Sequence, residues 1–365
     1  MGGTGVGVSG TGGHGTGANG THRGGAVRRA GVPAVLLLLA LALAAALVAG
    51  LALGPVRIPA DRVLAIVLGR ESTGPLASIV WDVRMPRVLL GAVVGAGLAV
   101  CGAVLQALVR NQLADPFLLG ASSGASAGAV LVLVLGAGAS FAGLSLPAAA
   151  FGGALAALVA VYALARRGGT MTTGRLILAG VAVQYVLSAL TSLVVVLAAK
   201  ADQVRSVMFW TLGGLGGARW NELALPAVAL ALGTGLLLTL ARPLDLLLTG
   251  EEDARTLGLD TGRFRAAVFV LTSLVVGVLV AYSGSIGFVG LMAPHAARAV
   301  VGAGHRALLP VAALGGAVFL TLADLVARTA AAPEEIPVGV VTALIGGPFF
   351  LWMLRRSPRT EGVAG

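Results

Sequence analysis

Few residues of this chain have the types and spacing that bond chemistry requires. A phosphate-binding P-loop needs a lysine after its glycines, and the only lysine among the 365 residues, Lys200, follows two alanines and precedes a third. The four histidines are dispersed, so no His-Glu-x-x-His pair is available to bind a catalytic zinc ion. The sequence therefore predicts a protein that is not an enzyme, with no catalytic residue, no metal site and no cofactor.

The ionisable residue that stands out inside an apolar segment is Asp324, with Arg328 four positions later. Side chains at this spacing are neighbours on a helix, so we predict an ion pair. The alternative is a proton relay, because a charge inside a membrane is costly and is usually kept for function. The other apolar segments are nearly free of charge, so an energy source for any work of this chain is expected to lie in another protein.

The longest polar segment between apolar segments is 242–265. Within it, Thr249 is predicted to cap a short helix whose first turn carries the acidic residues 251–253, where the helix dipole favours anions. Gly258 is predicted to end this helix. From composition alone, the helix is either a docking knob for a partner or an ordinary solvated connector.

These residues must be positioned by helices that lie in a membrane. Hydrophobic residues make up 57% of the chain and charged residues only 11%, whereas soluble domains carry about 25% charged residues. The 55 glycines suit transmembrane helices, which pack closely through small residues. The formal net charge of +10 comes from arginines scattered between apolar runs. Membrane topology explains this pattern better than nucleic-acid binding, so no nucleic-acid partner is expected.

About ten apolar segments approach the length needed to cross a bilayer. We therefore predict an all-α membrane protein with about ten transmembrane helices. The segments that begin near Phe117, Ala266 and Ile286 are short or interrupted, and some of them are expected to be broken helices. The predicted spans are Val32–Leu53, Val88–Leu108, Phe117–Leu135, Leu146–Ala165, Leu176–Ala198, Leu223–Ala241, Ala266–Ala281, Ile286–Val301, Leu308–Val326 and Val338–Leu354.

Both termini are predicted to be cytoplasmic. With the first helix entering from the cytoplasm, most of the 25 Lys and Arg residues fall in cytoplasmic segments, as the positive-inside rule requires. Residues 1–30 are rich in glycine and are expected to form a disordered cytoplasmic tail. Residues 31–357 form the predicted transmembrane domain, and residues 358–365 a cytoplasmic C-terminal tail. The arginines at 84, 87 and 328 fall on the outer side and are exceptions to the rule.

Four sequence blocks carry a family resemblance. They are Arg84–Arg87 with Gly91–Gly102 and Arg110–Ala125; Gly250–Gly258; Gly284–His295 with Arg298; and Ala323–Arg328 with Glu335–Gly339 and Gly346–Phe349. In this order, from about Pro33 to Arg356, they resemble the iron-chelate (siderophore)/cobalamin family of ABC importer transmembrane permeases, the FecCD type. Each block alone is weak evidence, but the four together are specific.

The resemblance implies a fold of ten transmembrane helices per permease subunit, two such subunits around a pathway, and a dimer of ATPase subunits beneath them. The loop between the sixth and seventh helices would couple to the ATPase. Arg84 and Arg328 would dock carboxylates of an extracytoplasmic substrate-binding protein, with snorkelling to the interface as the alternative for Arg84. The residues that match the coupling loop are Gly250, Glu251, Glu252, Ala254, Leu257 and Gly258.

The cytoplasmic gate implied by the resemblance lies at Thr172 and Thr173, which are also suited to cap the following helix. The expected substrate is an iron(III)-siderophore that passes whole as a small-molecule metal chelate, with His295 in a structural role. Cobalamin or haem is the alternative substrate, and a proton-coupled secondary transporter is the less favoured alternative mechanism. The second permease subunit would be an identical copy or a paralogue, in the lipid of a bacterial cytoplasmic (inner) membrane.

Overall fold

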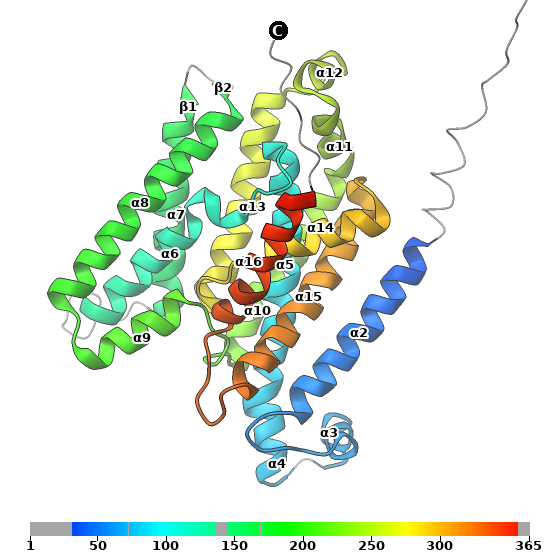
Figure 1. Ribbon diagram of the computed structural model, residues 1–365, viewed down its shortest axis with the longest axis vertical. Coiled ribbons are helices and arrows are strands. Elements are labelled where there is room, and N and C mark those ends of the chain that lie inside the picture. The colour runs from blue at the N-terminus through cyan, green and yellow to red at the C-terminus, as the bar shows by residue number, and fades with distance from the viewer. Residues whose placement is uncertain (1–30, 72, 136–144, 168–169, 357–365) are drawn as a thin grey trace, which may run out of the picture.

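The computed structural model shows a helical bundle with one short β-hairpin at one end (Figure 1). The structure describes residues 31–71, 73–135, 145–167 and 170–356, so the tails predicted at 1–30 and 358–365 lie outside the described residues. Seven described helices are long and apolar enough to cross a membrane, and three shorter apolar helices lie at Ala121–Leu135, Val289–Val301 and Val338–Met353. Each of the ten predicted spans coincides with one of these helices, which confirms the predicted fold class.

The first spanning helix, α2 (Val32–Ala52), is apolar on all sides and leans away from the bundle at its N-terminal end (Figure 1). Its buried residues are Ala46 and Gly50–Ala52, all in its last third. An apolar pocket of about 360 Å³ separates its N-terminal half from α14, α15 and α16. A helix that is apolar all round suits a lipid environment. The N-terminal half of α2 contacts the core through the partly buried Val35, Leu36 and Leu39, and its fully buried residues lie at the C-terminal end.

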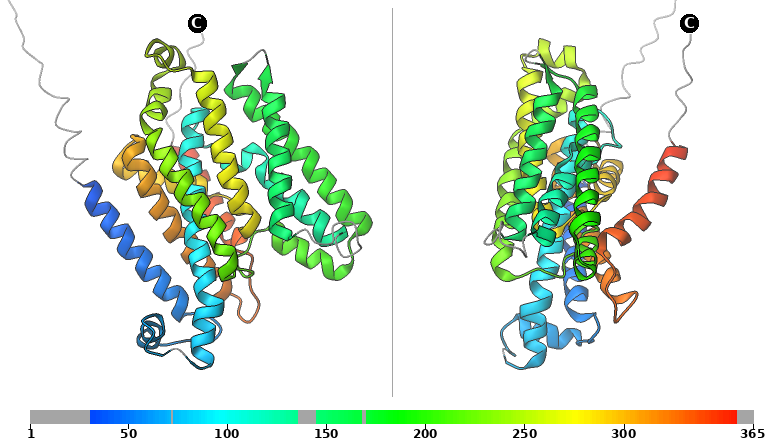
Figure 2. Two further views of the ribbon diagram at one scale, coloured as in Figure 1. Left: turned by 180° about the vertical axis from the view of Figure 1, so that it is seen from behind. Right: turned by 90° about the vertical axis from the view of Figure 1, so that its left-hand side faces the viewer.

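Three short helices follow α2 at the end of the bundle that we call the outer end. They are α3 (Ala60–Val67), α4 (Pro75–Ser78) and η1 (Ile79–Arg84). The π-helical turn of η1 continues directly into α5 (Met85–Val109), which runs through the centre of the bundle (Figures 1 and 2). Every residue of α5 from Val94 to Val109 is buried, so this helix forms the core on which the other helices pack.

Close backbone packing in the core joins α5 to α15 (His305–Thr329). A Cβ atom added to Gly95 would overlap the carbonyl oxygen of Gly316, and one added to Gly316 would overlap that of Gly95. Small residues allow this contact of backbone against backbone, which holds transmembrane helices together without a hydrophobic driving force. The two helices therefore pack as a pair with no side chain between them at this level.

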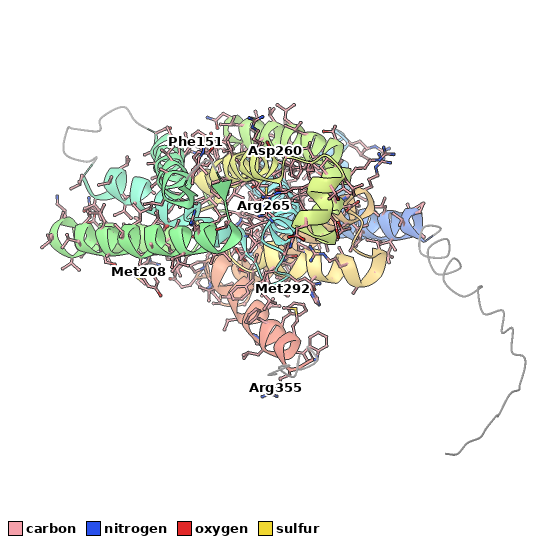
Figure 3. The ribbon with its side chains drawn as sticks, turned by 90° about the horizontal axis from the view of Figure 1, so that it is seen from above. Phe151, Met208, Asp260, Arg265, Met292 and Arg355 are labelled. Carbon is pink, nitrogen blue, oxygen red and sulfur yellow. The ribbon has the colours of Figure 1, made fainter. Side chains whose placement is uncertain are left out.

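A second group of helices lies beside α5. It consists of η2 (Pro116–Leu119), α6 (Ala121–Val130), η3 (Leu131–Leu135), α7 (Leu146–Ala165), α8 (Thr173–Ala198) and α9 (Ala201–Thr211). Strands β1 (Arg166–Arg167) and β2 (Thr170–Met171) pair antiparallel between α7 and α8, a feature that the sequence analysis did not predict. Seen from above, α8 lies along one side of the molecule with much of its apolar surface uncovered (Figure 3).

The chain returns through α10 (Trp220–Thr239) to the inner end of the bundle, opposite α3 and α4. There, α11 (Ala241–Thr249) and α12 (Glu251–Thr256) form a projecting arm before α13 (Thr261–Ser283) crosses back (Figure 1). Of the three segments among which broken helices are expected, the one near Ala266 is not broken, because α13 is continuous. Its first two turns carry Arg263 and Arg265, which made the apolar run look short.

The predicted breaks near Phe117 and Ile286 are confirmed. The first segment divides into η2, α6 and η3, and the second begins with a loop, 284–288, before the short helix α14 (Val289–Val301). The last spanning helix, α16 (Val338–Arg356), leaves the bundle sideways (Figures 2 and 3). His295 on α14 packs edge-on against Phe349 of α16, with 5.8 Å between ring centroids. Its Nδ1 has no hydrogen-bond partner, so packing alone describes its structural role.

Candidate functional site

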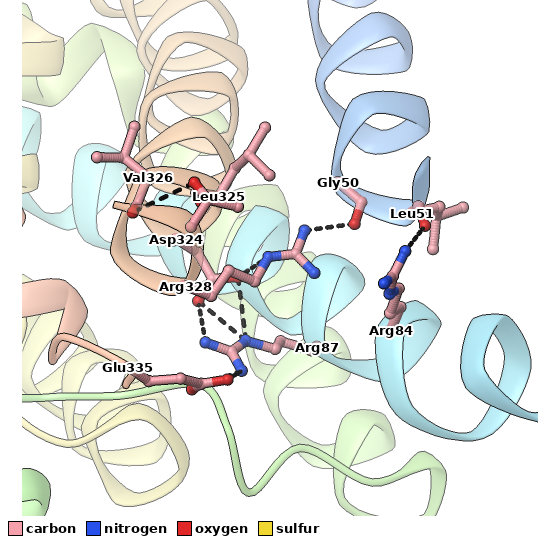
Figure 4. Close-up of polar contacts among 10 residues, drawn as sticks. Gly50, Leu51, Arg84, Arg87, Asp324, Leu325, Val326, Arg328 and Glu335 are labelled. Carbon is pink, nitrogen blue, oxygen red and sulfur yellow. Dashed lines mark hydrogen bonds and ion pairs between the residues drawn. The ribbon is translucent and has the colours of Figure 1, made fainter. Parts of the chain in front are cut away.

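Five charged residues meet at the outer end of the bundle, and we call them the outer charge cluster: Arg84, Arg87, Asp324, Arg328 and Glu335 (Figure 4). Arg87 is its centre. The Nη2 and Nε atoms of Arg87 donate to Asp324 at 2.9 Å and 3.0 Å, and its Nη1 donates to Glu335 at 3.0 Å. The side chain of Asp324 is 3% exposed and that of Glu335 is 44% exposed. Arg87 therefore links a buried carboxylate to a surface carboxylate.

The predicted i,i+4 ion pair between Asp324 and Arg328 is present, at 3.7 Å. The shorter contact of Asp324 is with Arg87, which lies on a different helix. A single sequence gives no signal for this pair, because the two residues are 237 positions apart. A carboxylate held between two arginines is suited to a structural ion pair, which supports that interpretation of Asp324 over a proton relay.

The two predicted docking residues, Arg84 and Arg328, are buried and point toward the end of α2. Arg84 donates to the carbonyl oxygens of Leu51 at 2.5 Å and Ala52 at 3.2 Å. Arg328 donates to the carbonyl oxygen of Gly50. The last carbonyls of a helix lack partners within the helix, and cationic side chains are favourable there. In this structure, these two guanidinium groups therefore fix the C-terminus of α2.

The inner end carries the projecting arm formed by α11 and α12, which we call the coupling arm (residues 241–256). Gly250, with φ of 142°, separates the two helices and occupies the N-cap position of α12. The prediction that Thr249 caps this helix is wrong, because its hydroxyl donates to the carbonyl of Leu246. Gly258 ends the segment as predicted, with φ of +87° and its N–H donated to Arg255.

The predicted coupling residues divide between the buried and exposed sides of α12. Ala254 is fully buried, whereas Glu252 is exposed and Leu257 is 66% exposed. A large apolar side chain beside acidic residues on a projecting knob is suited to insertion into a partner's groove. The side chain of Glu251 lies outside the described part of the structure.

The coupling arm is attached to the bundle on both sides of α11. Arg110, directly after α5, donates from Nε to the carbonyl oxygen of Leu247 at 3.0 Å. His305, the first residue of α15, donates its backbone N–H to Oδ1 of Asp245 at 3.0 Å, and its Nδ1 lies 2.6 Å from the same oxygen. The sequence analysis missed both contacts, since each one joins helices that are far apart in the sequence.

Thr172 and Thr173 lie where the β-hairpin meets α8, at the inner end of the bundle. Thr172 is the exposed N-cap residue, but its side chain makes no capping hydrogen bond. Its carbonyl accepts the N–H of Leu176 at 3.1 Å. A cytoplasmic gate at Thr172 and Thr173 stays a prediction.

A pocket of about 310 Å³ between α6, α8 and the loop 284–288 is lined mainly by serine and threonine residues, and we call it the hydroxyl pocket. Its lining includes Ser122, Ser123, Ser126, Gln184, Ser188, Thr191, Ser192, Thr211 and Ser285. Ser122 and Ser285 are in direct hydrogen-bond contact, which ties α6 to this loop. Neutral hydroxyl and amide groups offer hydrogen bonds without binding a metal ion tightly. Among the described residues, no group of three or more His, Cys, Asp or Glu side chains is placed to hold a metal ion.

Asp115 joins the two broken helices next to this pocket. It lies in the connection before η2, where its carboxylate accepts the N–H of Phe117 at 2.9 Å. It also accepts the backbone N–H of Phe288, the residue that precedes α14. Burial raises the pKa of this carboxyl group to about 6, although the two backbone hydrogen bonds act in the opposite direction. Phe288 has a φ of 69°, which a non-glycine residue adopts only when its surroundings hold it there.

Comparison with known proteins identifies the same family that the sequence blocks resemble. The sequence model of the FecCD transport family matches residues 39–356. The chain is 50% identical over 279 residues to the cobalamin import system permease protein BtuC of Halobacterium salinarum, which covers 76% of this chain and 73% of that protein. It is 44% identical over 280 residues to the vitamin B12 import system permease protein BtuC of Salmonella paratyphi A, covering 77% of this chain and 84% of that protein.

Two solved structures share the fold. One is an inward-facing conformation of a metal-chelate type ABC transporter. It superimposes with a TM-score of 0.78 at 33% identity and covers 88% of this chain and 99% of that chain. The other, PsaBC from Streptococcus pneumoniae in complex with Fab, has a TM-score of 0.54 at 16% identity, covering 81% of this chain and 96% of that chain. At that identity, the second likeness concerns the fold alone.

Proposed function

The chain belongs to the FecCD transport family, as a multi-pass ABC importer permease and not an enzyme, and we propose that its substrate is a cobalamin. The observation that carries this proposal is the identity of 50% and 44% to two permeases named for cobalamin and vitamin B12 import. The sequence analysis favoured an iron(III)-siderophore and kept cobalamin as the alternative. The relatives support that alternative better.

The lining of the hydroxyl pocket supports a substrate that passes whole. Its serine, threonine and glutamine side chains suit a large molecule that carries many amide and hydroxyl groups and keeps its own metal ion enclosed. Cobalamin has this chemistry, with cobalt held inside a corrin ring and amide groups around its edge. A ferric siderophore has it too, so the pocket alone does not favour one substrate over the other.

Uptake measurements distinguish the two substrates. Host cells that lack this permease would be complemented with the wild-type chain, and uptake of radiolabelled cyanocobalamin and of a ferric hydroxamate siderophore would be compared. We expect ATP-dependent uptake of cyanocobalamin only. Uptake of the siderophore alone would overturn the cobalamin proposal and restore the iron-siderophore prediction. Uptake that survives ATP depletion but stops when the proton gradient collapses would instead identify a secondary transporter.

We further propose that α12 meets a partner ATPase at the inner end. The support is the exposed Leu257 next to acidic side chains on a helix that projects from the bundle. A second permease subunit, identical or a paralogue, would cover α8 and complete the pathway. The uncovered apolar surface of α8 beside the hydroxyl pocket supports this arrangement.

An extracytoplasmic binding protein is proposed to dock at the outer charge cluster through Arg84 and Arg328. The support is an accumulation of three arginines at the outer end, which would attract carboxylates. Because both guanidinium groups already hold carbonyls of α2, docking through them would have to act on the end of that helix. Binding of the protein to vesicles containing Arg84→Lys or Arg328→Lys permease, compared with wild type, tests this role. An unchanged Kd for both variants would exclude it.

A further inference from the structure

The same two helices connect the outer charge cluster with the coupling arm. At the outer end, Arg87 on α5 is paired with Asp324 on α15. At the inner end, Arg110 directly follows α5 and His305 begins α15. Both of these residues hold α11, the first one through the carbonyl of Leu247 and the second one through the carboxylate of Asp245. Each of the two helices therefore extends from the outer charge cluster to the coupling arm.

Between these two ends, α5 and α15 are in direct backbone contact. Gly95 and Gly316 leave no room for a Cβ atom on either helix. A close-packed interface of this kind has no free volume in which one helix could slide over the other. The Arg87–Asp324 pair adds a second fixed point on the same interface. The two helices therefore behave as one rigid unit, which we call the α5–α15 pair.

Asp245 supplies a hydrogen-bond acceptor for the N-terminus of α15, which has no capping side chain of its own. The first N–H groups of a helix have no partner within the helix, and an Asp or Ser side chain at the N-cap usually accepts one of them. Here the N-cap residue is Gly304, which has no side chain. The carboxylate of Asp245, on another helix, takes this place by accepting the N–H of His305. Its negative charge is also favourable at the positive end of the helix dipole.

Asp245 also contacts the ring of His305, and this contact orients its carboxylate toward α15. The ring of His305 is 1% exposed, and its Nδ1 lies 2.6 Å from the carboxylate oxygen that accepts the backbone N–H. One oxygen thus holds both the backbone and the side chain of the first residue of α15. On the same helix, Ala241, Leu244 and Leu247 are fully buried, and Leu244 and Leu247 belong to one core cluster with Leu308 and Leu309 of α15. The coupling arm is consequently attached to α15 by both charge and apolar packing.

We propose that Asp245 is a positioning residue for energy coupling, because it fastens the coupling arm to the α5–α15 pair. A movement imposed on α12 then reaches the outer charge cluster as a displacement of one rigid unit. The inference rests on the proposed function, in which α12 meets an ATPase. The inference adds a specific route for the movement, through α11 to the α5–α15 pair. It also names Asp245, which lies outside the proposed ATPase contact, as a residue that this route needs.

The test uses the complete transporter with its ATPase and binding protein in proteoliposomes, with cyanocobalamin as the probe. Asp245→Ala should co-purify with the ATPase and keep basal ATP hydrolysis within twofold of wild type. Uptake per ATP hydrolysed should fall at least tenfold. Asp245→Asn keeps an oxygen acceptor and should recover at least half of the wild-type ratio. A merely structural role would instead lower assembly, hydrolysis and uptake together.

Asp260→Ala is the matched control. Asp260 is also a carboxylate that caps a helix at the inner end, but it accepts the N–H of Arg263 within its own segment. Among the described residues, its polar side-chain contacts are with Arg263 alone. Its removal should leave uptake per ATP at the wild-type level. Equal ratios for Asp245→Ala and wild type would overturn the proposal, as would an equal loss in Asp260→Ala.

A crosslink keeps the proposal testable even if Asp245→Ala assembles poorly. Cysteines placed at 245 and 305 should uncouple the transporter, and a short thiol crosslinker between them should restore uptake. Uptake that stays low after crosslinking would overturn the proposal, because a covalent link between α11 and α15 would then fail to replace the contact of Asp245. The single native cysteine, Cys101, is buried and does not compete for the reagent. If wild type shows no ATP-dependent uptake, the proposed function fails, whatever the variants do.

Discussion

Arg87 and Asp324, on α5 and α15, form a two-point ion pair in which Nε and Nη2 of the guanidinium both donate to one carboxylate at 2.9 to 3.1 Å. Both side chains are largely buried. Removing one member of such a pair leaves the other charge without compensation, which costs more than the pair itself contributes. The pair therefore fixes how the two central helices pack at the outer end.

Asp324→Ala should lower the stability of the permease by about 3–5 kcal/mol, the usual cost of breaking a buried ion pair. Glu335→Ala is the control, since Glu335 meets the same arginine from the surface and should cost less than about 1 kcal/mol. Thermal unfolding of the purified chain in mild detergent measures the difference. Similar midpoints for the two variants would contradict the structural role of Asp324.

Gly95→Ala should disrupt the α5–α15 pair, because its methyl group would overlap the carbonyl oxygen of Gly316. Overpacking of a close interface costs about 1–3 kcal/mol, and contact with rigid backbone favours the upper part of this range. Gly315→Ala is the matched control on α15, where an added Cβ meets open space. The two unfolding midpoints should differ by several degrees, and a drop in Gly315→Ala alone would show that the helix contact is misplaced.

Leu257→Asp and Glu252→Lys should each reduce the amount of ATPase that co-purifies with the permease. The first substitution removes the exposed apolar side chain of the coupling arm, and the second reverses a charge beside it. Glu334→Lys, an exposed charge reversal at the outer end, is the control. Quantitative immunoblotting of the eluate would show the effect, and full recovery of ATPase with both inner variants would exclude α12 as its docking site.

Substitution of Ser188 or Ser192 by leucine should lower substrate uptake at least fivefold while basal ATP hydrolysis stays unchanged. Both residues line the hydroxyl pocket, where apolar groups remove hydrogen bonds that the substrate needs. Val186→Leu, an exposed apolar position on the same helix, is the control. Normal uptake by both serine variants would place the pathway elsewhere.

Asp115 should make the stability of the permease fall as the pH rises. Its folded pKa of about 6 lies above the ordinary value of 3.8, so between these values the folded state binds more protons than the unfolded state. Stability is therefore lost between about pH 4 and pH 6, by about 3 kcal/mol at most, and changes no further above pH 6. Asp115→Asn should flatten this part of the unfolding profile. A variant with the same slope as wild type would assign the slope to another group.

Apolar run length was enough to predict the ten spans, because a membrane selects for continuous apolar surface. It misjudged α13, where Arg265 lies buried among helices although it looks like a segment boundary in the sequence. The coupling arm was predicted from its polar composition, but its cap was placed one residue early, at Thr249 instead of Gly250. A residue's type does not show which of two neighbours will adopt the cap conformation.

Contacts between helices that are far apart in the chain could not be predicted from a single sequence. Arg87 stood within a predicted family block, yet its pairing with Asp324 depends on how α5 and α15 pack. The same holds for Asp245 and His305, which are 60 positions apart. Arg84 and Arg328 were correctly noticed as unusual outer charges, but their carbonyl partners on α2 became visible only in three dimensions. Their docking role stays a prediction.

The loose packing of α2 has a consequence for where this protein can work. An apolar pocket lies between part of its N-terminal half and α14 and α15, although Val35, Leu36 and Leu39 also pack against the core. Inside a bilayer such a space is filled by acyl chains. Part of the packing of this helix is thus supplied by the surrounding lipid and not by the amino-acid sequence. The polar contacts of α2 lie at its C-terminal end, so its apolar N-terminal half is the part that adjusts to the thickness of the hydrocarbon layer. Chain length and saturation of the host's lipids therefore contribute to the position of this half of α2.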